Sequence, residues 1–148
     1  MPIIITRGNN VYGLNQYPEK VIPRFIEQLK KGEKVTIQGN GSCVRAFLHA
    51  EDTAYAFLKI LEKGKVGEIY NIGCDEGMEY SILEVAKILI KKIKGVNEEE
   101  DCAQWISFIE DRPFNDLRYY ISNQKLKELG WTIKMDFFAG LNELCWEK

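Results

Sequence analysis

The stretch IIITRGNNVYGLNQYPEKVIPRFIEQLKKG, residues 3–32, indicates the fold class. It begins with Ile3–Thr6, a continuous apolar and β-branched run that is typical of a strand buried on both faces of a parallel sheet. A polar loop follows, and Glu19–Lys31 then has the pattern of a helix. Pro23 lies near its start, where a missing N–H is tolerated, and Gly32 follows its end. A buried strand that leads through a loop into a helix favours an α/β fold.

The rest of the chain continues this alternation. The expected strands are Glu33–Ile37, Gly67–Gly73 and Trp105–Ile109, and the expected helices are about Glu51–Lys63, Ile82–Lys94, Ser122–Leu129 and Asp136–Trp146. Ser81 and Glu84 have the spacing of a capping box before the second of these helices, and Gly95 follows that helix. Segments 8–18, 38–50, 96–103 and 110–120 are expected to be loops. A complete doubly wound domain needs several more parallel strands, so the order is typical of half of a larger α/β enzyme.

One helix has a clear apolar pattern. Ala54, Phe57, Leu58 and Leu61 are spaced i, i+3, i+4 and i+7, which predicts that they form the buried face of the helix Glu51–Lys63. Tyr55 and Lys59 match the pattern Tyr-x-x-x-Lys in the same helix, but the tyrosine lies among apolar positions. We therefore interpret Tyr55 as a core residue.

Composition limits the classes of function. The chain has 148 residues, 45% apolar and 28% charged residues, and a net charge of −2. This length fits one domain over residues 1–148, and the charge gives no reason to expect binding to nucleic acid or to an anionic membrane. The apolar runs are all well below 18 residues, so no transmembrane helix is expected. Four single cysteines and one histidine do not favour a zinc site or a disulfide framework, and a reduced, cytoplasmic location is expected.

Polar side chains follow the expected strands. They are Asn9 and Asn10 with Glu19 and Lys20, then Arg45, then Asn71, then Arg112, Asn115, Asp116 and Arg118. Loops at the carboxyl ends of strands form the ligand crevice in α/β proteins, and arginine with asparagine suits an anionic, hydroxyl-rich ligand. The alternatives are surface ion pairs, such as Arg112 with Asp111 or Asp116, and asparagines that only form turns.

Four segments resemble a known family in order and spacing. They are TRGNNVYGLNQYPEKVIPRFI (residues 6–26), IQGNGSCVRAFLHAEDTAYAF (37–57), GEIYNIG (67–73) and DRPFNDLRYYISNQKLKELGW (111–131). They are similar to successive motifs of the dTDP-glucose 4,6-dehydratases, which are extended short-chain dehydrogenase/reductases. The resemblance covers nearly the whole chain. It implies the C-terminal, substrate-binding part of that α/β fold, with one or more strands left over from the Rossmann sheet.

The resemblance also implies a site for a dTDP-sugar or a related nucleotide sugar. Asn10 and Lys20 would lie near the phosphates, with Glu19 and Val21 lining the cleft. Arg45 and Arg112 would hold the pyrophosphate. The remaining implied contacts are Thr36, Ile37 and Gln38 at the base, Asn71 at the nucleoside, and Asn115 and Tyr119 near the phosphates.

This sequence departs from the family pattern at four positions. Proline is frequent where this chain has Leu14, and an aromatic residue is frequent at Gln38. An acidic or amide residue is common where Ala46 stands, and histidine is common at Asn115. The last three departures bear on base preference and phosphate affinity.

The family's chemistry is a hydride cycle on bound NAD, and it implies motifs that this sequence lacks. The glycine-rich loop, the catalytic Tyr-x-x-x-Lys and the acid/base carboxylates all lie N-terminal to the region matched here. Gly39–Gly41 form a GxG without a third glycine and without a following helix, so we do not expect a dinucleotide site there. We therefore expect an absent NAD-binding half, no cofactor and no catalytic residue in this chain, and no activity from the chain alone.

Two alternatives remain at this level. The chain is either the binding part of a dehydratase or a non-enzymatic module that oligomerises or binds a partner and keeps a vestigial pocket. A fragment of a nucleotide-sugar epimerase is a further reading of the same motifs. Without its parallel neighbours, Ile3–Thr6 would be an association-prone strand, so a homo-oligomer through this strand is a candidate assembly.

Overall fold

A computed structural model of the protein describes residues 1–146. Helices and strands alternate along the chain, which confirms the predicted α/β class. The chain divides into two compact units. The first contains residues 1–13, 45–79 and 119–140, and the second contains residues 14–44, 80–118 and those from 141 onward. A single nucleotide-sugar-binding domain over residues 1–148 stays a prediction.

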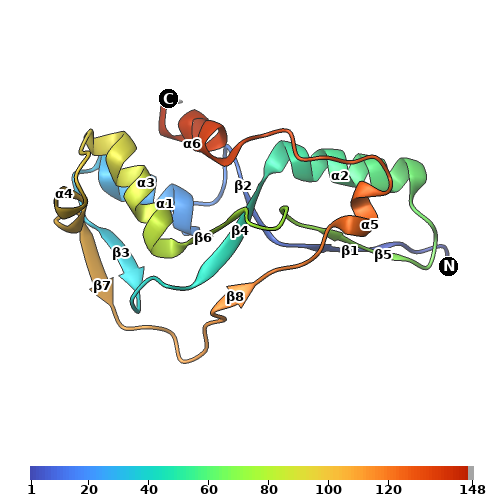
Figure 1. Ribbon diagram of the computed structural model, residues 1–148, viewed down its shortest axis with the longest axis horizontal. Coiled ribbons are helices and arrows are strands. Elements are labelled where there is room, and N and C mark those ends of the chain that lie inside the picture. The colour runs from blue at the N-terminus through green and yellow to red at the C-terminus, as the bar shows by residue number, and fades with distance from the viewer. Residues whose placement is uncertain (147–148) are drawn as a thin grey trace. The chain divides into compact units, whose positions relative to one another are not determined.

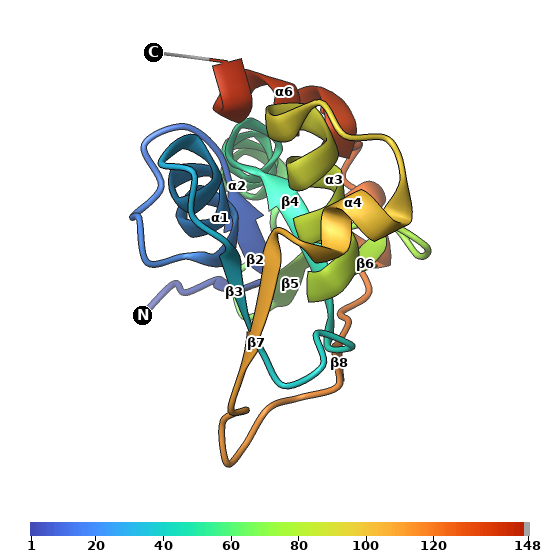
Figure 2. The same cartoon turned by 90° about the vertical axis from the view of Figure 1, so that its left-hand side faces the viewer.

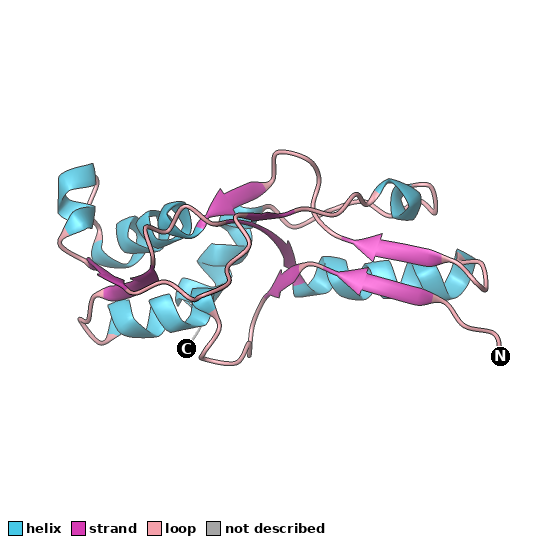
Figure 3. Ribbon diagram, turned by 90° about the horizontal axis from the view of Figure 1, so that it is seen from below, coloured by secondary structure: helices cyan, strands magenta, loops and turns pink. Residues whose placement is uncertain are grey.

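The first unit contains two parallel strand pairs. Strand β1 (Ile5–Gly8) pairs with β5 (Ile69–Ile72), with Ile5 opposite Ile69. Strand β2 (Asn10–Tyr12) pairs with β4 (Val44–His49). Figure 3 shows the two strands of the β1–β5 pair side by side, and Figure 1 shows helix α2 (Ala50–Lys63) running along them.

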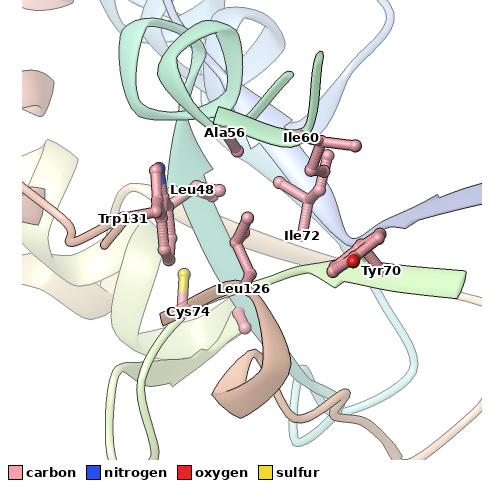
Figure 4. Close-up of a cluster of buried hydrophobic side chains, with 9 residues drawn as sticks. Leu48, Ala56, Ile60, Tyr70, Ile72, Cys74, Leu126 and Trp131 are labelled. Atoms are coloured by element: carbon pink, nitrogen blue, oxygen red, sulfur yellow. The ribbon is translucent and has the colours of Figure 1, made fainter. Parts of the chain in front are cut away.

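Nine buried side chains form the core of the first unit (Figure 4). They are Ala46, Leu48, Ala56, Ile60, Tyr70, Ile72, Cys74, Leu126 and Trp131. They come from β4, α2, β5, α5 (Gln124–Lys127) and the segments that follow β5 and α5. In Figure 4 Trp131 and Tyr70 lie at opposite ends of the cluster, with Leu48 and Ile72 between them. Each large apolar side chain buried in this way contributes about 1.5–3 kcal/mol relative to exposure.

The second unit places two helices against a parallel strand pair (Figure 2). Helix α1 (Val21–Lys30) packs on α3 (Ile82–Lys94), and β3 (Val35–Gln38) pairs with β7 (Ile106–Ile109). The two helices bury one face each, formed by Ile22, Phe25, Ile26 and Leu29 of α1 and Val85, Ala86, Leu89 and Ile90 of α3. The strand pair therefore ends beside a helical layer, with both carboxyl ends on the same side.

Four further elements complete the described chain. They are β6 (Glu79–Ser81), α4 (Glu99–Ala103), β8 (Arg118–Tyr119) and α6 (Phe137–Trp146). Strands β4, β6 and β8 and helix α6 each include a point where the chain passes from one unit to the other.

Local sequence signals located most helices correctly. The α3 prediction is confirmed together with its capping box. In that box the Ser81 hydroxyl accepts from the backbone N–H of Glu84, and Glu84 accepts from the backbone N–H of Ser81. Gly95 ends the helix in a left-handed conformation, as expected at this position. The α1, α2 and α6 predictions are each correct to within two residues.

The four predicted loops were partly wrong. Segment 8–18 contains strand β2, segment 38–50 contains strand β4, segment 96–103 contains the short helix α4, and segment 110–120 contains the short strand β8. β2 and β4 pair with each other across more than 30 residues of sequence, so neither strand is visible in its local pattern. Helix α4 buries the side chain of Cys102, although the acidic residues of this segment suggest an exposed loop.

The predicted buried face of α2 was also wrong. The helix buries Asp52, Ala56 and Ile60 instead, whereas Phe57 is 50% and Leu61 is 83% exposed. Small side chains on the buried face let the rest of the unit approach the helix closely, and the carboxylate of Asp52 is fixed by hydrogen bonds. Hydrophobic spacing alone therefore selected the wrong face.

The strand prediction for Ile3–Thr6 needs two corrections. The strand covers Ile5–Gly8, and it is not buried on both faces, because Ile3 is 46% and Ile5 is 50% exposed. Within the described residues, β1 pairs with β5 alone. Ile4 packs against the core cluster, so one face of β1 is covered and the other is open.

Candidate functional site

The carboxyl ends of β3 and β7 bring two predicted site residues together in the second unit. Gln38 is the last residue of β3, and Arg112 follows β7 by three residues. The Nε atom of Arg112 donates to the Oε1 atom of Gln38 at 2.7 Å. The backbone N–H of Gly39 donates to the carbonyl of Ile109 at 2.9 Å, which continues the pairing beyond the strands. Arg112 and Gln38 thus form a polar pair at the edge where α/β proteins bind ligands.

Asp111 organises the loop around this pair. Its Oδ1 atom accepts from the backbone N–H of Arg112 at 2.8 Å and from Nδ2 of Asn115 at 3.0 Å. The sequence analysis considered an ion pair between the side chains of Arg112 and Asp111. Instead, the guanidinium group bonds to Gln38. No interaction of the Arg112 Nη groups with any described residue is present.

Two glycines beside this loop are required by its geometry. Gly39 has φ +60°, and a Cβ atom there would lie 2.7 Å from Oδ2 of Asp111. Gly41 has φ +74°, and its Cβ atom would lie 2.9 Å from the Cγ2 atom of Ile37. The GxG motif therefore serves close packing of the β3 end.

The other predicted base contacts lie in β3. Thr36 is held by two side chains of α1. Arg24 donates to its carbonyl at 3.0 Å, and Gln28 bonds both its backbone N–H and its hydroxyl. Ile37 is fully buried. Sequence reasoning missed Arg24 and Gln28, whose only local signal is that they lie four residues apart on a helix.

Glu19, Lys20 and Val21 lie at the start of α1. Lys20 is the N-cap residue, and its side chain makes no capping hydrogen bond. Its backbone N–H donates to the carbonyl of Tyr17, and its carbonyl accepts from the backbone N–H of Arg24. Lys20 and Glu19 are exposed, so the ammonium group is available to a ligand at the positive end of the helix.

The remaining predicted residues lie in the first unit. Asn71, in β5, donates through Nδ2 to the carbonyl of Ser122 at 3.1 Å. Asn10 opens β2, and its backbone N–H donates to the side chain of Asn9, which in turn donates to the carbonyl of Tyr119. These contacts tie segment 119–122 to the ends of β1 and β5. Arg45 lies in β4 of the same unit.

His49, which precedes α2, and Tyr55, within α2, have structural roles that were not predicted from the sequence. The ring of His49 accepts from the backbone N–H of Glu51 and caps the helix. Tyr55 is 46% exposed, so its interpretation as a core residue was wrong, and the ammonium group of Lys134 lies 4.5 Å from its ring centroid. Lys59, its partner in the Tyr-x-x-x-Lys match, pairs with Glu62.

Comparison with known proteins identifies the class. Residues 1–73 match the sequence profile of the NAD dependent epimerase/dehydratase family. The chain is 47% identical to a dTDP-D-glucose 4,6-dehydratase of Bos taurus over 142 residues, which cover 96% of this chain and 39% of the relative. This chain is therefore a relative of the NAD dependent epimerase/dehydratase family.

Within this family the chain is similar to the dTDP-glucose 4,6-dehydratases, as the sequence motifs predicted. The structure of the Bacillus anthracis enzyme in complex with NAD superimposes with a TM-score of 0.84 and 36% identity. The Streptomyces venezuelae enzyme gives 0.88 and 33%. Each comparison covers 96–98% of this chain and 43% of the other. The chain thus spans about two fifths of the length of the relatives it matches.

No helix among the described residues is both long enough and apolar enough to cross a membrane. They also contain no group of three or more histidine, cysteine or acidic side chains placed to hold a metal ion.

Proposed function

We propose that this chain is the nucleotide-sugar-binding part of an NAD-dependent dTDP-glucose 4,6-dehydratase. The complete reaction converts dTDP-glucose to dTDP-4-keto-6-deoxyglucose. In this proposal the chain binds the nucleoside diphosphate of the substrate, and the hydride and proton transfers are performed by residues outside it. The chain alone is then inactive.

The observation that carries the proposal is the Gln38–Arg112 pair at the carboxyl ends of β3 and β7. A guanidinium group at a strand end, fixed by a neutral amide, keeps its full positive charge for a phosphate. The similarity to the dehydratases covers 96% of this chain.

The other site residues receive roles in the same proposal. Lys20 and Arg45 supply further positive charge for the two phosphates. Asn115 lies near Arg112, because Asp111 accepts a hydrogen bond from each of them. The base lies at the end of β3. The further substrate contacts are Asn10, Glu19, Val21, Thr36, Ile37, Asn71 and Tyr119.

NAD, which the family uses, does not fit the one GxG motif of this chain. Gly39 lies against the carboxylate of Asp111, and Gly41 lies against Ile37. A dinucleotide pyrophosphate site needs backbone N–H groups at a helix N-terminus, whereas strand β4 follows this motif. We therefore assign no cofactor to this chain and derive no step through NAD.

Calorimetric titration with dTDP tests the proposal. The wild-type chain is expected to bind dTDP, and Arg112→Ala is expected to weaken binding about tenfold or more, because charged hydrogen bonds contribute about 1.5–3 kcal/mol. Lys31→Ala is the matched control, since Lys31 is an exposed cation of the same unit that pairs with Glu27. A folded wild-type chain that binds no dTDP would contradict the proposal.

A second candidate function has one observation in its favour. Phe57, Leu58 and Leu61 form an exposed apolar face on α2, which suits a module that binds a partner or a second copy of itself. Sedimentation velocity at high concentration tests this candidate. A self-association that Leu58→Asp abolishes and Leu117→Asp, at another exposed leucine, leaves unchanged would support it, and a clean monomer would exclude the homo-oligomer.

A further inference from the structure

The side chain of Arg112 is held by Gln38 at the end of the β3–β7 strand pair. Gln38 lies opposite Ile109 in the β3–β7 register, and the backbone bond from Gly39 to Ile109 fixes the end of the pair. The side chain of Arg112 reaches back across this end, and its Nε atom lies 2.7 Å from Oε1 of Gln38.

The chemistry of the two groups fixes their orientation. A guanidinium group only donates hydrogen bonds, so the amide of Gln38 must present its oxygen to Arg112. This bond occupies Nε, which removes the mode in which arginine binds an anion through Nε and one Nη. The mode that uses both Nη groups remains, and neither Nη group interacts with a described residue.

The neighbouring carboxylate does not neutralise the arginine. Oδ1 of Asp111 is engaged by the backbone N–H of Arg112 and by the amide of Asn115. The partner of the guanidinium group is thus a neutral amide, and the charge of Arg112 remains available.

We propose that Gln38 is a positioning residue, which holds Arg112 so that its two Nη groups bind a phosphate of a nucleoside diphosphate. This inference rests on the proposed function and deepens it. Gln38 acts through Arg112, so its contribution to phosphate binding exists only while Arg112 is present.

Gln38→Glu is the most informative variant, because it keeps the shape and the accepting oxygen but adds a negative charge beside the guanidinium group. Affinity for dTDP, measured by calorimetry, is expected to fall at least fivefold. Gln104→Glu is the matched control, because Gln104 is an exposed glutamine of the same unit, and it should bind within twofold of wild type.

A double-mutant cycle separates positioning from an independent contact. Gln38→Ala, which adds no charge, should weaken binding when Arg112 is present and change the affinity by less than twofold in the Arg112→Ala background. An equal loss in both backgrounds would overturn the proposal, and so would wild-type affinity in the single variant. If the wild-type chain binds no dTDP, the proposed function fails, and the phosphate part of this inference fails with it.

Whether Gln38 holds the side chain of Arg112 can be measured without any ligand. The Nε–H proton of Arg112, assigned in a nitrogen–proton NMR spectrum by its loss in Arg112→Lys, should exchange with water more slowly in wild type than in Gln38→Ala. Equal exchange rates would show that Gln38 does not hold the arginine and would overturn the inference whatever the dTDP result.

Discussion

Replacing Asp52 tests the account of the first unit most severely. Its carboxylate is 1% exposed and accepts from the backbone N–H of Lys134 at 3.0 Å and from that of Met135 at 3.0 Å. It also lies in the first turn of α2, where negative charge is favourable. The carboxylate therefore ties the segment after α5 to the start of α2.

The size of the effect follows from these contacts. Asp52→Ala removes two hydrogen bonds to a charged acceptor, each with a net contribution of about 1.5 kcal/mol, so the free energy of unfolding should fall by about 3 kcal/mol. For a chain of this length that corresponds to a decrease in Tm of about 6–12 °C. Asp52→Asn keeps one accepting oxygen, and about half of the loss is expected.

Urea unfolding followed by circular dichroism gives the free energy. Glu51→Ala is the control, because Glu51 is an exposed acid of the same helical turn and its loss should cost about 0.3–1 kcal/mol. If Asp52→Ala is no more destabilising than Glu51→Ala, the reasoning about this bonding arrangement is wrong.

Three further predictions concern stability and reactivity. Gly140→Ala should lower the urea midpoint by an amount equivalent to about 1–3 kcal/mol, because its Cβ atom would lie 2.3 Å from the hydroxyl of Tyr12, and an unchanged midpoint would refute this packing. Burial raises the pKa of the Cys74 thiol to about 12, and all four cysteines are buried, so a thiol reagent at pH 8 should label the native chain slowly and the urea-unfolded chain at four sites. Burial alone would raise the pKa of Asp75. Hydrogen bonds from Lys127 and Asn123, together with the charge of Lys127, outweigh this effect, so the pKa is lowered overall. The ionised Asp75 carboxylate therefore stabilises the fold above about pH 4, and this stabilisation is lost as the pH falls through the lowered pKa of Asp75. Lys127→Met should therefore flatten acid unfolding below pH 4, and an identical acid profile would contradict the assignment.

The sequence predicted those elements whose signals are local. Helix α3 has its capping box and its final glycine within 15 residues, and both were found correctly. Strands β2 and β4 have no such signal, because their evidence is their pairing with each other. The α2 face was mistaken because Asp52 and Ala56 do not look like core residues, although hydrogen bonds and close packing make them so.

The candidate site, like the fold, could be predicted from the sequence only in part. Arg112 could be named from sequence, since polar residues after parallel strands share one edge. Gln38 was implied only by the family resemblance, as a contact to the base. The bond between Arg112 and Gln38 could not be predicted, because the two residues are separated by 74 positions. Asp111 could be suspected only as an ion-pair partner of Arg112, whereas it orders the loop through the backbone of Arg112 and through Asn115.

Titration of dTDP and NAD into the same preparation of the wild-type chain tests the central claim most directly. The account predicts saturable binding of dTDP, weakened in Arg112→Ala and retained in Lys31→Ala, and no binding of NAD. A folded chain that binds NAD, or that binds dTDP equally well with and without Arg112, would contradict it.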